Sequence, residues 1–372
     1  MYRSTVMACE LKLLVIWLLI SIVANYLQPL VHAQPQVPCY FVLGDSLFDN
    51  GNNNNLQTSI KANYPPYGVD FPSGPTGRFC NGRNMADQIG RRLGFDDSPP
   101  PFATARGQDI LKGVNYASGG AGIRDETGRQ LGSVISLNRQ LVNLQTTVSN
   151  ITAFLGSKEA TDDYLKRCIF VVGTGNNDYL NNYLLPQYYN TSSIFNPDQY
   201  AAALIRQYSD QLRTLYGLGA RKVAIFGIFQ VGCTPTRRAQ SGSNGSLCVD
   251  SDNSDVQLFN NRLKPLVDEL NSNLTGAQFI YINSSGYQYI SIPPLVDIPI
   301  TSPPCCKLAS SGVVKEFLCE PNQVPCNLRN TYIFFDGAHP TEILNAYIAT
   351  RAYTPLTPHD AYPFGIRQLA QQ

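Results

Sequence analysis

The chain has 372 residues, 43% of them hydrophobic and 15% charged, so it is long enough and apolar enough to bury a large core. Lysine and arginine (28 residues) nearly balance aspartate and glutamate (27), without a basic stripe or an acidic tail. This balance excludes the charge pattern of a nucleic-acid-binding surface, and we expect no nucleic-acid partner.

Residues 1–33 have the pattern of a secretory signal peptide. Arg3 and Lys12 precede an apolar run, residues 13–24, which has the length of a signal-peptide core and is short for a membrane span. Small residues at positions 31 and 33 predict cleavage after Ala33; an uncleaved anchor is the alternative. Because no later segment is apolar enough to span, we expect a secreted protein without a membrane span once the signal is removed.

Sequons and cysteines also indicate an oxidising, secretory compartment. The chain has ten cysteines, and five Asn-x-Ser/Thr sequons are candidate glycosylation sites: Asn150, Asn190, Asn244, Asn273 and Asn283.

Loss of Cys9 with the signal peptide leaves nine cysteines, and Cys168, inside an apolar run, is predicted to be the unpaired buried thiol. Cys233 and Cys248 are expected to close a short loop. Two local bridges, with their connectivity open, are expected among Cys305, Cys306, Cys319 and Cys326. Their spacing does not match paired CxxC zinc ligands and no histidine lies nearby, so we expect no metal.

Apolar runs of strand length alternate with stretches of helical periodicity along the rest of the chain. Strands are predicted at residues 40–43, 113–117, 169–172, 222–226 and 278–282, and helices at about 84–93, 133–155, 197–218, 255–274 and 341–351. A Pro- and Gly-rich loop (64–79) and a Pro- and Cys-rich segment (292–327) interrupt the pattern. This alternation predicts an α/β fold, with a parallel sheet covered by helices on both faces, as a single domain over residues 34–372.

Ligands of such folds bind beyond the carboxyl ends of the strands. Four apolar runs end in loops that carry Gly, Ser, Asn, Asp or His, and the architecture gathers these loops at one edge: Ser46, Gly119-Gly120, Asn177 and residues 336–339.

His339 is the candidate general base, because only His339 and His359 remain after the signal peptide and His359 lies in a polar tail. A neutral imidazole is the usual acceptor of a serine proton, and Ser46 needs such a base to become a nucleophile. Asp336, three residues before His339, can orient the imidazole.

Backbone N–H groups of Gly119 or Gly120 and the side chain of Asn177 are candidate donors to an oxyanion. Taken singly, these residues also suit a tight turn and a helix cap.

Four ordered blocks resemble the plant secreted branch of the GDSL esterase/lipases, within the SGNH hydrolases. Gly44-Asp45-Ser46-Leu47 is the motif that names the family, and the other blocks are residues 115–120, 175–178 and 336–340. The resemblance covers essentially the whole chain after the signal peptide. A G-x-S-x-G elbow, which the ordinary α/β-hydrolases carry, does not occur.

The resemblance implies a three-layer, flavodoxin-like fold with about five parallel strands. It also implies that Ser46 is the nucleophile and, through its N–H, the first oxyanion donor. Gly120 aligns as the second donor (Gly119 if the alignment slips by one residue), Asn177 supplies a side-chain donor, and Asp336 and His339 complete the triad.

We therefore expect a secreted serine esterase or lipase of the cell wall or apoplast that forms an acyl-enzyme without a metal or cofactor. Its expected substrate is a small-molecule, lipid or cell-wall ester. The alternatives are an acyltransferase using the same acyl-enzyme, a non-catalytic cell-wall-binding protein, and a glycosidase using two carboxylates of Asp45, Asp49, Asp178 and Asp336. Four loop aromatics either line an acyl site or pin their loop: Tyr64, Tyr67, Phe71 and Phe79.

Overall fold

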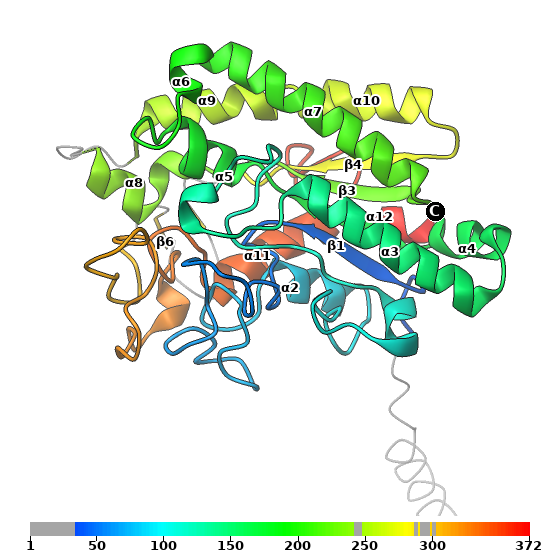
Figure 1. Cartoon of the computed structure of the whole chain (residues 1–372), viewed down its shortest axis with the longest axis horizontal. Helices are drawn as coiled ribbons and strands as arrows, with labels where there is room; N and C mark the ends of the chain where they lie inside the picture. The colour runs from blue at the N-terminus through cyan, green and yellow to red at the C-terminus, as the bar shows by residue number, and fades with distance from the viewer. Residues whose placement is uncertain (1–33, 242–247, 286–288, 291–297, 300–302) are drawn as a thin grey trace, which may run out of the picture. The chain divides into compact units, whose positions relative to one another are not determined.

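A computed structural model of the chain describes residues 34–241, 248–285, 289–290, 298–299 and 303–372. The predicted signal peptide and the sequon at Asn244 lie outside the described residues. Residues Gln36–Gln372 form one unit (Figure 1).

Five strands form the central sheet, in the order β1-β2-β3-β4-β7. They are β1 (Tyr40–Gly44), β2 (Ile169–Gly173), β3 (Lys222–Phe226), β4 (Gln278–Ile282) and β7 (Ala361–Tyr362). The first four are parallel and in register, whereas β7 pairs antiparallel with β4. A separate antiparallel pair is formed by β5 (Tyr289–Ile290) and β6 (Ile298–Pro299).

Both faces of the parallel strands are apolar because both are covered by helices. In β1, Phe41 and Leu43 belong to the core on one face, and Tyr40 and Val42 to the core on the other. This alternation explains why the strands read as uninterrupted apolar runs in the sequence.

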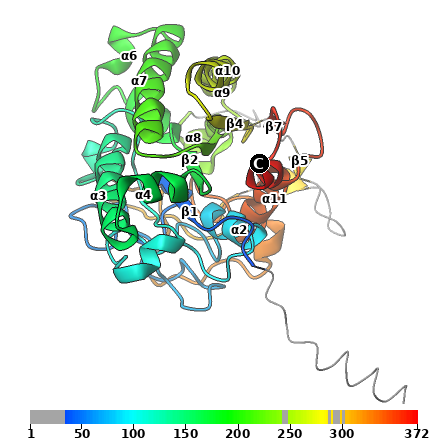
Figure 2. The same ribbon diagram turned by 90° about the vertical axis from the view of Figure 1, so that its right-hand side faces the viewer.

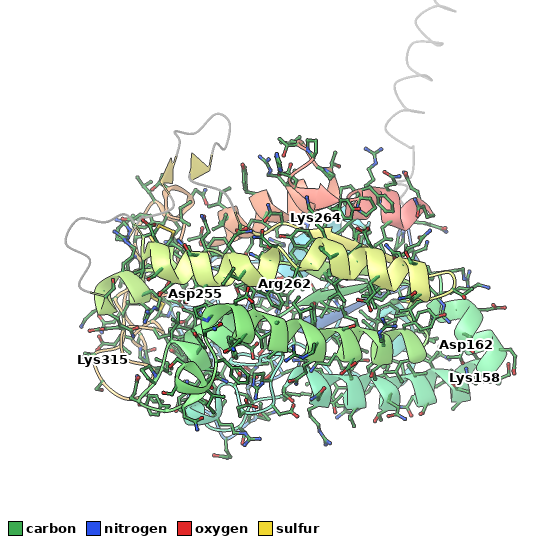
Figure 3. The ribbon with its side chains drawn as sticks, turned by 90° about the horizontal axis from the view of Figure 1, so that it is seen from above. Lys158, Asp162, Asp255, Arg262, Lys264 and Lys315 are labelled. Atoms are coloured by element: carbon green, nitrogen blue, oxygen red, sulfur yellow. A yellow bond between two sulfur atoms is a disulfide. The ribbon has the colours of Figure 1, made fainter. Side chains whose placement is uncertain are left out.

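The helices form a layer on each face of the sheet (Figures 1 and 2). One layer contains α3 (Leu137–Leu155), α4 (Lys158–Leu165), α7 (Pro197–Gly217), α9 (Asp250–Asn260) and α10 (Leu263–Asn273). The other contains α2 (Met85–Arg92), α11 (Glu342–Tyr353) and α12 (Ile366–Gln371). The first layer carries charged side chains at its surface, among them the exposed Lys158–Asp162 ion pair on α4 (Figure 3). The predicted three-layer α/β fold is confirmed.

Short helices occupy the loops between these elements. They are α5 (Asn176–Asp178), α6 (Thr191–Ile194), α8 (Pro235–Gln240), η1 (Gly107–Lys112), η2 (Arg129–Leu131), η3 (Tyr179–Tyr183), η4 (Val231–Cys233) and η5 (Arg329–Thr331). In the chain, α5 directly follows β2, and η4 and then α8 follow β3; α8 lies at the left of Figure 1.

Two sequence predictions need correction. Residues 113–117 lie parallel to β1 but form no continuous ladder: Asn115 makes isolated bridges to Val42 on one side and to Pro101 on the other. Beyond the short pairing with Pro101, the Asn52 amide donates to the carbonyls of Asn115 and Ala117 at 2.9 and 2.8 Å, so a side chain takes part in bonds that a neighbouring strand would otherwise make. The helix predicted over residues 255–274 is two helices, α9 and α10, with a turn between them.

The unpaired thiol was also predicted wrongly. Cys168 forms a disulfide with Cys39, and Cys80 is the buried free cysteine, its Sγ 2.9 Å from the Gly82 carbonyl. Each partner of the disulfide directly precedes a strand, and the register of β1 with β2 places them side by side. Sequence patterns do not reveal this adjacency, because the two residues are 129 positions apart.

The other cysteine predictions are confirmed. Cys233 pairs with Cys248, and the Cys-rich segment contains two bridges, Cys305–Cys326 and Cys306–Cys319. No helix within the described ranges has the length and apolar character needed to cross a bilayer.

Thiol mapping tests the disulfide pattern. When the chain without residues 1–33 is denatured without reductant and treated with a thiol-alkylating reagent, we expect a single labelled cysteine, on the peptide that contains Cys80. After reduction, Cys39 and Cys168 become labelled together with the other paired cysteines. Labelling of Cys168 before reduction would contradict the structure.

Candidate active site

Ser46, His339 and Asp336 form a continuous series of hydrogen bonds. Ser46 Oγ lies 2.8 Å from His339 Nε2, and His339 Nδ1 lies 2.8 Å from Asp336 Oδ2. Since the carboxylate can only accept, Nδ1 carries the hydrogen of the neutral ring and Nε2 is free to accept from the serine hydroxyl. Asp336 is fully buried, whereas Ser46 keeps 7% of its surface exposed, so the series opens to solvent at the serine end.

The turn after β1 places Ser46. A side chain at Gly44 would put its Cβ 2.4 Å from the Gly173 carbonyl oxygen, so only glycine allows this approach of β1 to β2. Asp45 holds the turn, because its carboxylate accepts from the Leu47 N–H at 3.0 Å and from the Asn176 amide at 2.9 Å. Burial raises the pKa of Asp45 to about 6, against the effect of these hydrogen bonds.

A tight turn before α11 places the other two side chains. Asp336 Oδ1 accepts from the backbone N–H groups of Ala338 and His339 at 2.9 and 2.7 Å. The imidazole lies beside two aromatic rings, with centroid distances of 4.9 Å to Phe79 and 5.6 Å to Phe317. The local turn therefore sets the carboxylate, and aromatic packing limits rotation of the imidazole.

The residues predicted to be oxyanion donors differ in whether their N–H groups are already used within the protein. The backbone N–H groups of Ser46 and Gly120 have no hydrogen-bond acceptor among the described residues. The Gly119 N–H, in contrast, donates to Asp49 Oδ2 at 3.0 Å. Asn177 Nδ2 donates one hydrogen to the Ala121 carbonyl at 2.9 Å, which leaves the other available. This geometry favours Gly120 over Gly119 as a donor.

Two buried carboxylates, of Asp49 and Asp178, accept hydrogen bonds from loops near the predicted oxyanion donors. Besides Gly119, Asp49 accepts from the N–H groups of Gly51 and Asn52 at 2.7 and 2.8 Å. Asp178 accepts from the N–H groups of Ile123 and Arg124 and from the Thr127 hydroxyl at 2.7, 3.0 and 2.8 Å. Burial raises the pKa of both carboxyls to about 6, and these hydrogen bonds oppose the shift.

In the glycosidase alternative, Asp45, Asp49 and Asp178 are candidates for the catalytic carboxylates. Their carboxylates are instead occupied by backbone and side-chain donors. Such a bonded carboxylate supports a loop rather than a reaction at a glycosidic bond.

A pocket opens in front of Ser46, with about 410 Å³ of empty space that includes its open mouth. Its apolar lining consists of Leu47, Leu180, Phe229, Val231, Phe317, Ala338 and Pro340. Asn177, His339 and Thr234 supply polar groups. An apolar pocket with a few polar groups at one point is the usual form of a small-ligand site.

Sequence reasoning missed most of this lining. Leu180, Phe229 and Val231 follow β2 and β3 closely, so the rule that ligands bind beyond the strand ends could have found them. None of the four loop aromatics singled out in the sequence lines the pocket. Tyr67 and Phe79 instead belong to a third core cluster that joins their loop to the Cys-rich segment.

Three described sequons, Asn150, Asn190 and Asn273, are exposed, whereas Asn283 is half-buried. No group of three or more His, Cys, Asp or Glu side chains in the described part of the chain could hold a metal ion.

Comparison with known proteins adds the following. A family model described as GDSL-like Lipase/Acylhydrolase matches residues 40–352. Two Arabidopsis thaliana proteins, named GDSL esterase/lipase At1g29670 and GDSL esterase/lipase At1g29660, are 51% and 48% identical to this chain. The alignments cover 91% and 92% of this chain and 93% of each relative. A third relative from the same organism, GDSL esterase/lipase At5g45670, is 46% identical over 91% of the chain and 93% of its own length.

The serine–histidine contact predicts selective chemical labelling. A fluorophosphonate should react with Ser46 alone, because Ser46 Oγ is paired with the basic nitrogen of His339. Ser118 is a matched control: it too follows a strand-like run, but its hydroxyl donates to Asn53 Oδ1 at 2.6 Å. We expect Ser118→Ala to keep the label and His339→Ala to lose it. Labelling that survives Ser46→Ala would contradict the assignment.

Proposed function

Because the chain belongs to the GDSL-like lipase/acylhydrolase family, we propose that it is a secreted serine esterase or lipase that hydrolyses carboxylic esters through an acyl-enzyme on Ser46. The observation that carries the proposal is the hydrogen-bonded series Ser46–His339–Asp336 at an apolar pocket. The roles of the three residues in such a series are nucleophile, general base and orienting acid.

In the acylation step, Ser46 Oγ attacks the ester carbonyl carbon while His339 Nε2 takes the serine proton. The carbonyl oxygen becomes an oxyanion, which the N–H groups of Ser46 and Gly120 and the Asn177 amide stabilise. Asp336 stabilises the imidazolium. When the intermediate collapses, the bond to the alcohol oxygen breaks, His339 returns the proton to that oxygen, and the alcohol leaves.

Deacylation repeats the same steps with water in place of serine. His339 takes a proton from the water as its oxygen attacks the acyl carbon. Collapse of the second intermediate then releases the carboxylic acid, and the proton on His339 returns to Ser46. The proposed mechanism needs no electron transfer: Ser46, water and the proton carried by His339 account for every bond that forms and breaks.

Three features support secretion. The sequence pattern of residues 1–33 predicts a signal peptide, four disulfides suit an oxidising compartment, and exposed sequons are available for glycosylation. We place the protein in the extracellular space, in the cell wall or apoplast. Its substrates are then small-molecule, lipid or cell-wall esters whose acyl group enters the apolar pocket.

Replacement of the nucleophile tests the reaction directly. We expect Ser46→Ala to lower kcat for a short-chain aryl ester by about 10⁶-fold, as loss of a serine nucleophile does elsewhere. The melting temperature should stay close to that of the parent protein, since the change removes one partly exposed hydroxyl. Release of the free acid without an added alcohol distinguishes hydrolysis from acyl transfer. Full activity of the folded variant would refute the mechanism.

Asn177 provides a second test. Asn177→Ala removes a donor that acts on the oxyanion, so kcat should fall by about 10²–10³-fold while KM changes little. Steady-state kinetics with the same ester measures both constants. An unchanged kcat, or a loss confined to KM, would remove Asn177 from the oxyanion site.

A further inference from the structure

One buried hydroxyl contacts the catalytic series and has no role in the mechanism above. Tyr67 Oη lies 2.6 Å from Asp336 Oδ2, and the residue is 1% exposed. A distance this short is typical of a hydroxyl donating to a carboxylate, which is among the stronger hydrogen bonds in proteins. Tyr67 belongs to the Pro- and Gly-rich loop, 269 positions before Asp336 in the chain.

The backbone of Cys319 fixes the direction of this hydrogen bond. The Cys319 N–H donates to Tyr67 Oη at 3.0 Å, so an oxygen lone pair of the hydroxyl is occupied. The single hydroxyl hydrogen is then directed to Asp336, which can only accept. Burial, together with the nearby Asp336 charge, raises the pKa of Tyr67 well above its ordinary value, so the hydroxyl remains protonated and remains a donor.

The ring of Tyr67 is held on several sides. It makes edge contacts with Tyr64, Phe79 and Phe335, at centroid distances of 5.3, 6.1 and 5.7 Å. Phe79 in turn lies beside the His339 imidazole. Phe79 therefore packs against both His339 and Tyr67, and Tyr67 contacts Asp336.

The Cys-rich segment contains Cys319, whose N–H donates to the Tyr67 hydroxyl. Cys319 is held by its disulfide to Cys306, and its carbonyl accepts from the Tyr64 hydroxyl at 3.0 Å. The same segment contacts the catalytic turn, because the Gly337 N–H donates to the Phe317 carbonyl at 2.9 Å. A Cβ at Gly337 would lie 2.4 Å from the Glu316 carbonyl oxygen, so only glycine allows this approach.

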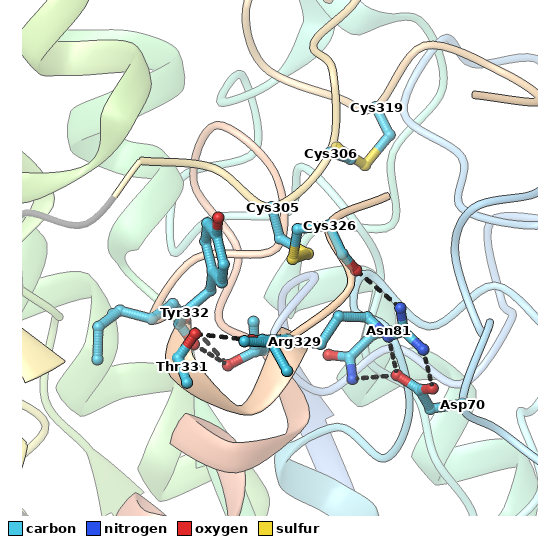
Figure 4. The surroundings of a disulfide bond; sticks show 12 residues. Asp70, Asn81, Cys305, Cys306, Cys319, Cys326, Arg329, Thr331 and Tyr332 are labelled. Carbon is cyan, nitrogen blue, oxygen red and sulfur yellow. Dashed lines mark hydrogen bonds and ion pairs between the residues drawn. A yellow bond between two sulfur atoms is a disulfide. The ribbon is translucent and has the colours of Figure 1, made fainter. Parts of the chain in front are cut away.

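An ion pair joins the loop that carries Tyr67 to Arg329, which lies just beyond the Cys-rich segment (Figure 4). Arg329 makes two hydrogen bonds to Asp70, at 2.6 and 2.8 Å, and Asn81 donates to the same carboxylate at 2.8 Å. The loop and the Cys-rich segment are thus held together by the contacts of Tyr64 and Tyr67 with Cys319. The Asn322 N–H also donates to the Pro65 carbonyl at 2.8 Å, and this ion pair adds a contact just beyond the segment.

We propose that Tyr67 is a positioning residue for the catalytic acid: its hydroxyl, held by the Cys319 backbone, fixes Asp336 Oδ2 so that the carboxylate keeps His339 directed at Ser46. The proposal rests on the ester hydrolysis proposed above. Backbone N–H groups fix only Oδ1 of Asp336, so Tyr67 is the donor, apart from the imidazole, that acts on Oδ2. The irregular segment is therefore part of the machinery that orients the triad.

Tyr67→Phe tests the role, because phenylalanine keeps the ring contacts and removes only the hydroxyl. We expect kcat to fall by about 10- to 100-fold, as small misplacements of catalytic groups cause, with KM within about twofold of the parent value. Tyr164→Phe is the matched control: it removes a hydroxyl that donates to the Leu111 carbonyl at 2.8 Å and contacts none of the residues around Asp336. The control should keep the parent kcat. A parent-like kcat in Tyr67→Phe, or an equal loss in both variants, overturns the proposal.

The hydrogen-bonded Nδ1 proton of His339 gives a readout that does not depend on catalysis. Only His339 and His359 remain after residue 33, so proton NMR of a His359→Gln variant assigns the signal. Tyr67→Phe should shift and broaden this resonance by changing the Asp336–Nδ1 hydrogen bond, whereas Tyr164→Phe should leave it in place. An unmoved resonance in Tyr67→Phe overturns the proposal, while hydrolysis that persists in Ser46→Ala would overturn the proposed function instead.

Discussion

A carboxylate buried in the protein needs hydrogen bonds, and Asp336 obtains them from its own turn and from a distant loop. Burial of an unpaired charge costs several kcal/mol, so its neighbours must supply donors. Its own turn supplies the backbone N–H groups of Ala338 and His339, the Pro- and Gly-rich loop supplies Tyr67, and the imidazole supplies Nδ1. The same bonds that make the buried charge tolerable also fix the orientation of His339. The stability of this turn and the geometry of the site therefore depend on the same set of hydrogen bonds to Asp336.

The sheet explains how residues so distant in sequence meet. Its parallel strands end at one edge, where the turn after β1 carries Ser46 and α5, directly after β2, carries Asn177. Glycine at position 44 lets β1 approach β2, and the carboxylates of Asp49 and Asp178 take the backbone donors of the neighbouring loops. One glycine N–H is thereby used for structure, at Gly119, while the next one, at Gly120, stays available for a ligand.

Much of this could be predicted from the sequence, and the failures have physical causes. The strands β1 to β4 are buried on both faces and read as apolar runs, and Asn84 and Asn196 mark helix starts with capping boxes. Residues 113–117 look like a strand, but their outer hydrogen bonds are shared between the backbone around Pro101 and the Asn52 side chain, which no periodicity reveals. Tyr67 and the pocket lining come from irregular segments, whose positions are set by tertiary contacts. The Cys39–Cys168 bridge likewise depends on which strands are neighbours.

The central claim is that an acyl group passes through Ser46, and trapping that intermediate tests it most directly. The protein is mixed with a short-chain aryl ester, quenched in acid within the first turnover, and digested for mass spectrometry. The account predicts a peptide containing Ser46 whose mass rises by one acyl group in place of one hydrogen. It also predicts that the acylated peptide disappears as the ester is consumed. Continued hydrolysis while every Ser46 peptide keeps its unmodified mass, or acylation of another residue at the turnover rate, would contradict it.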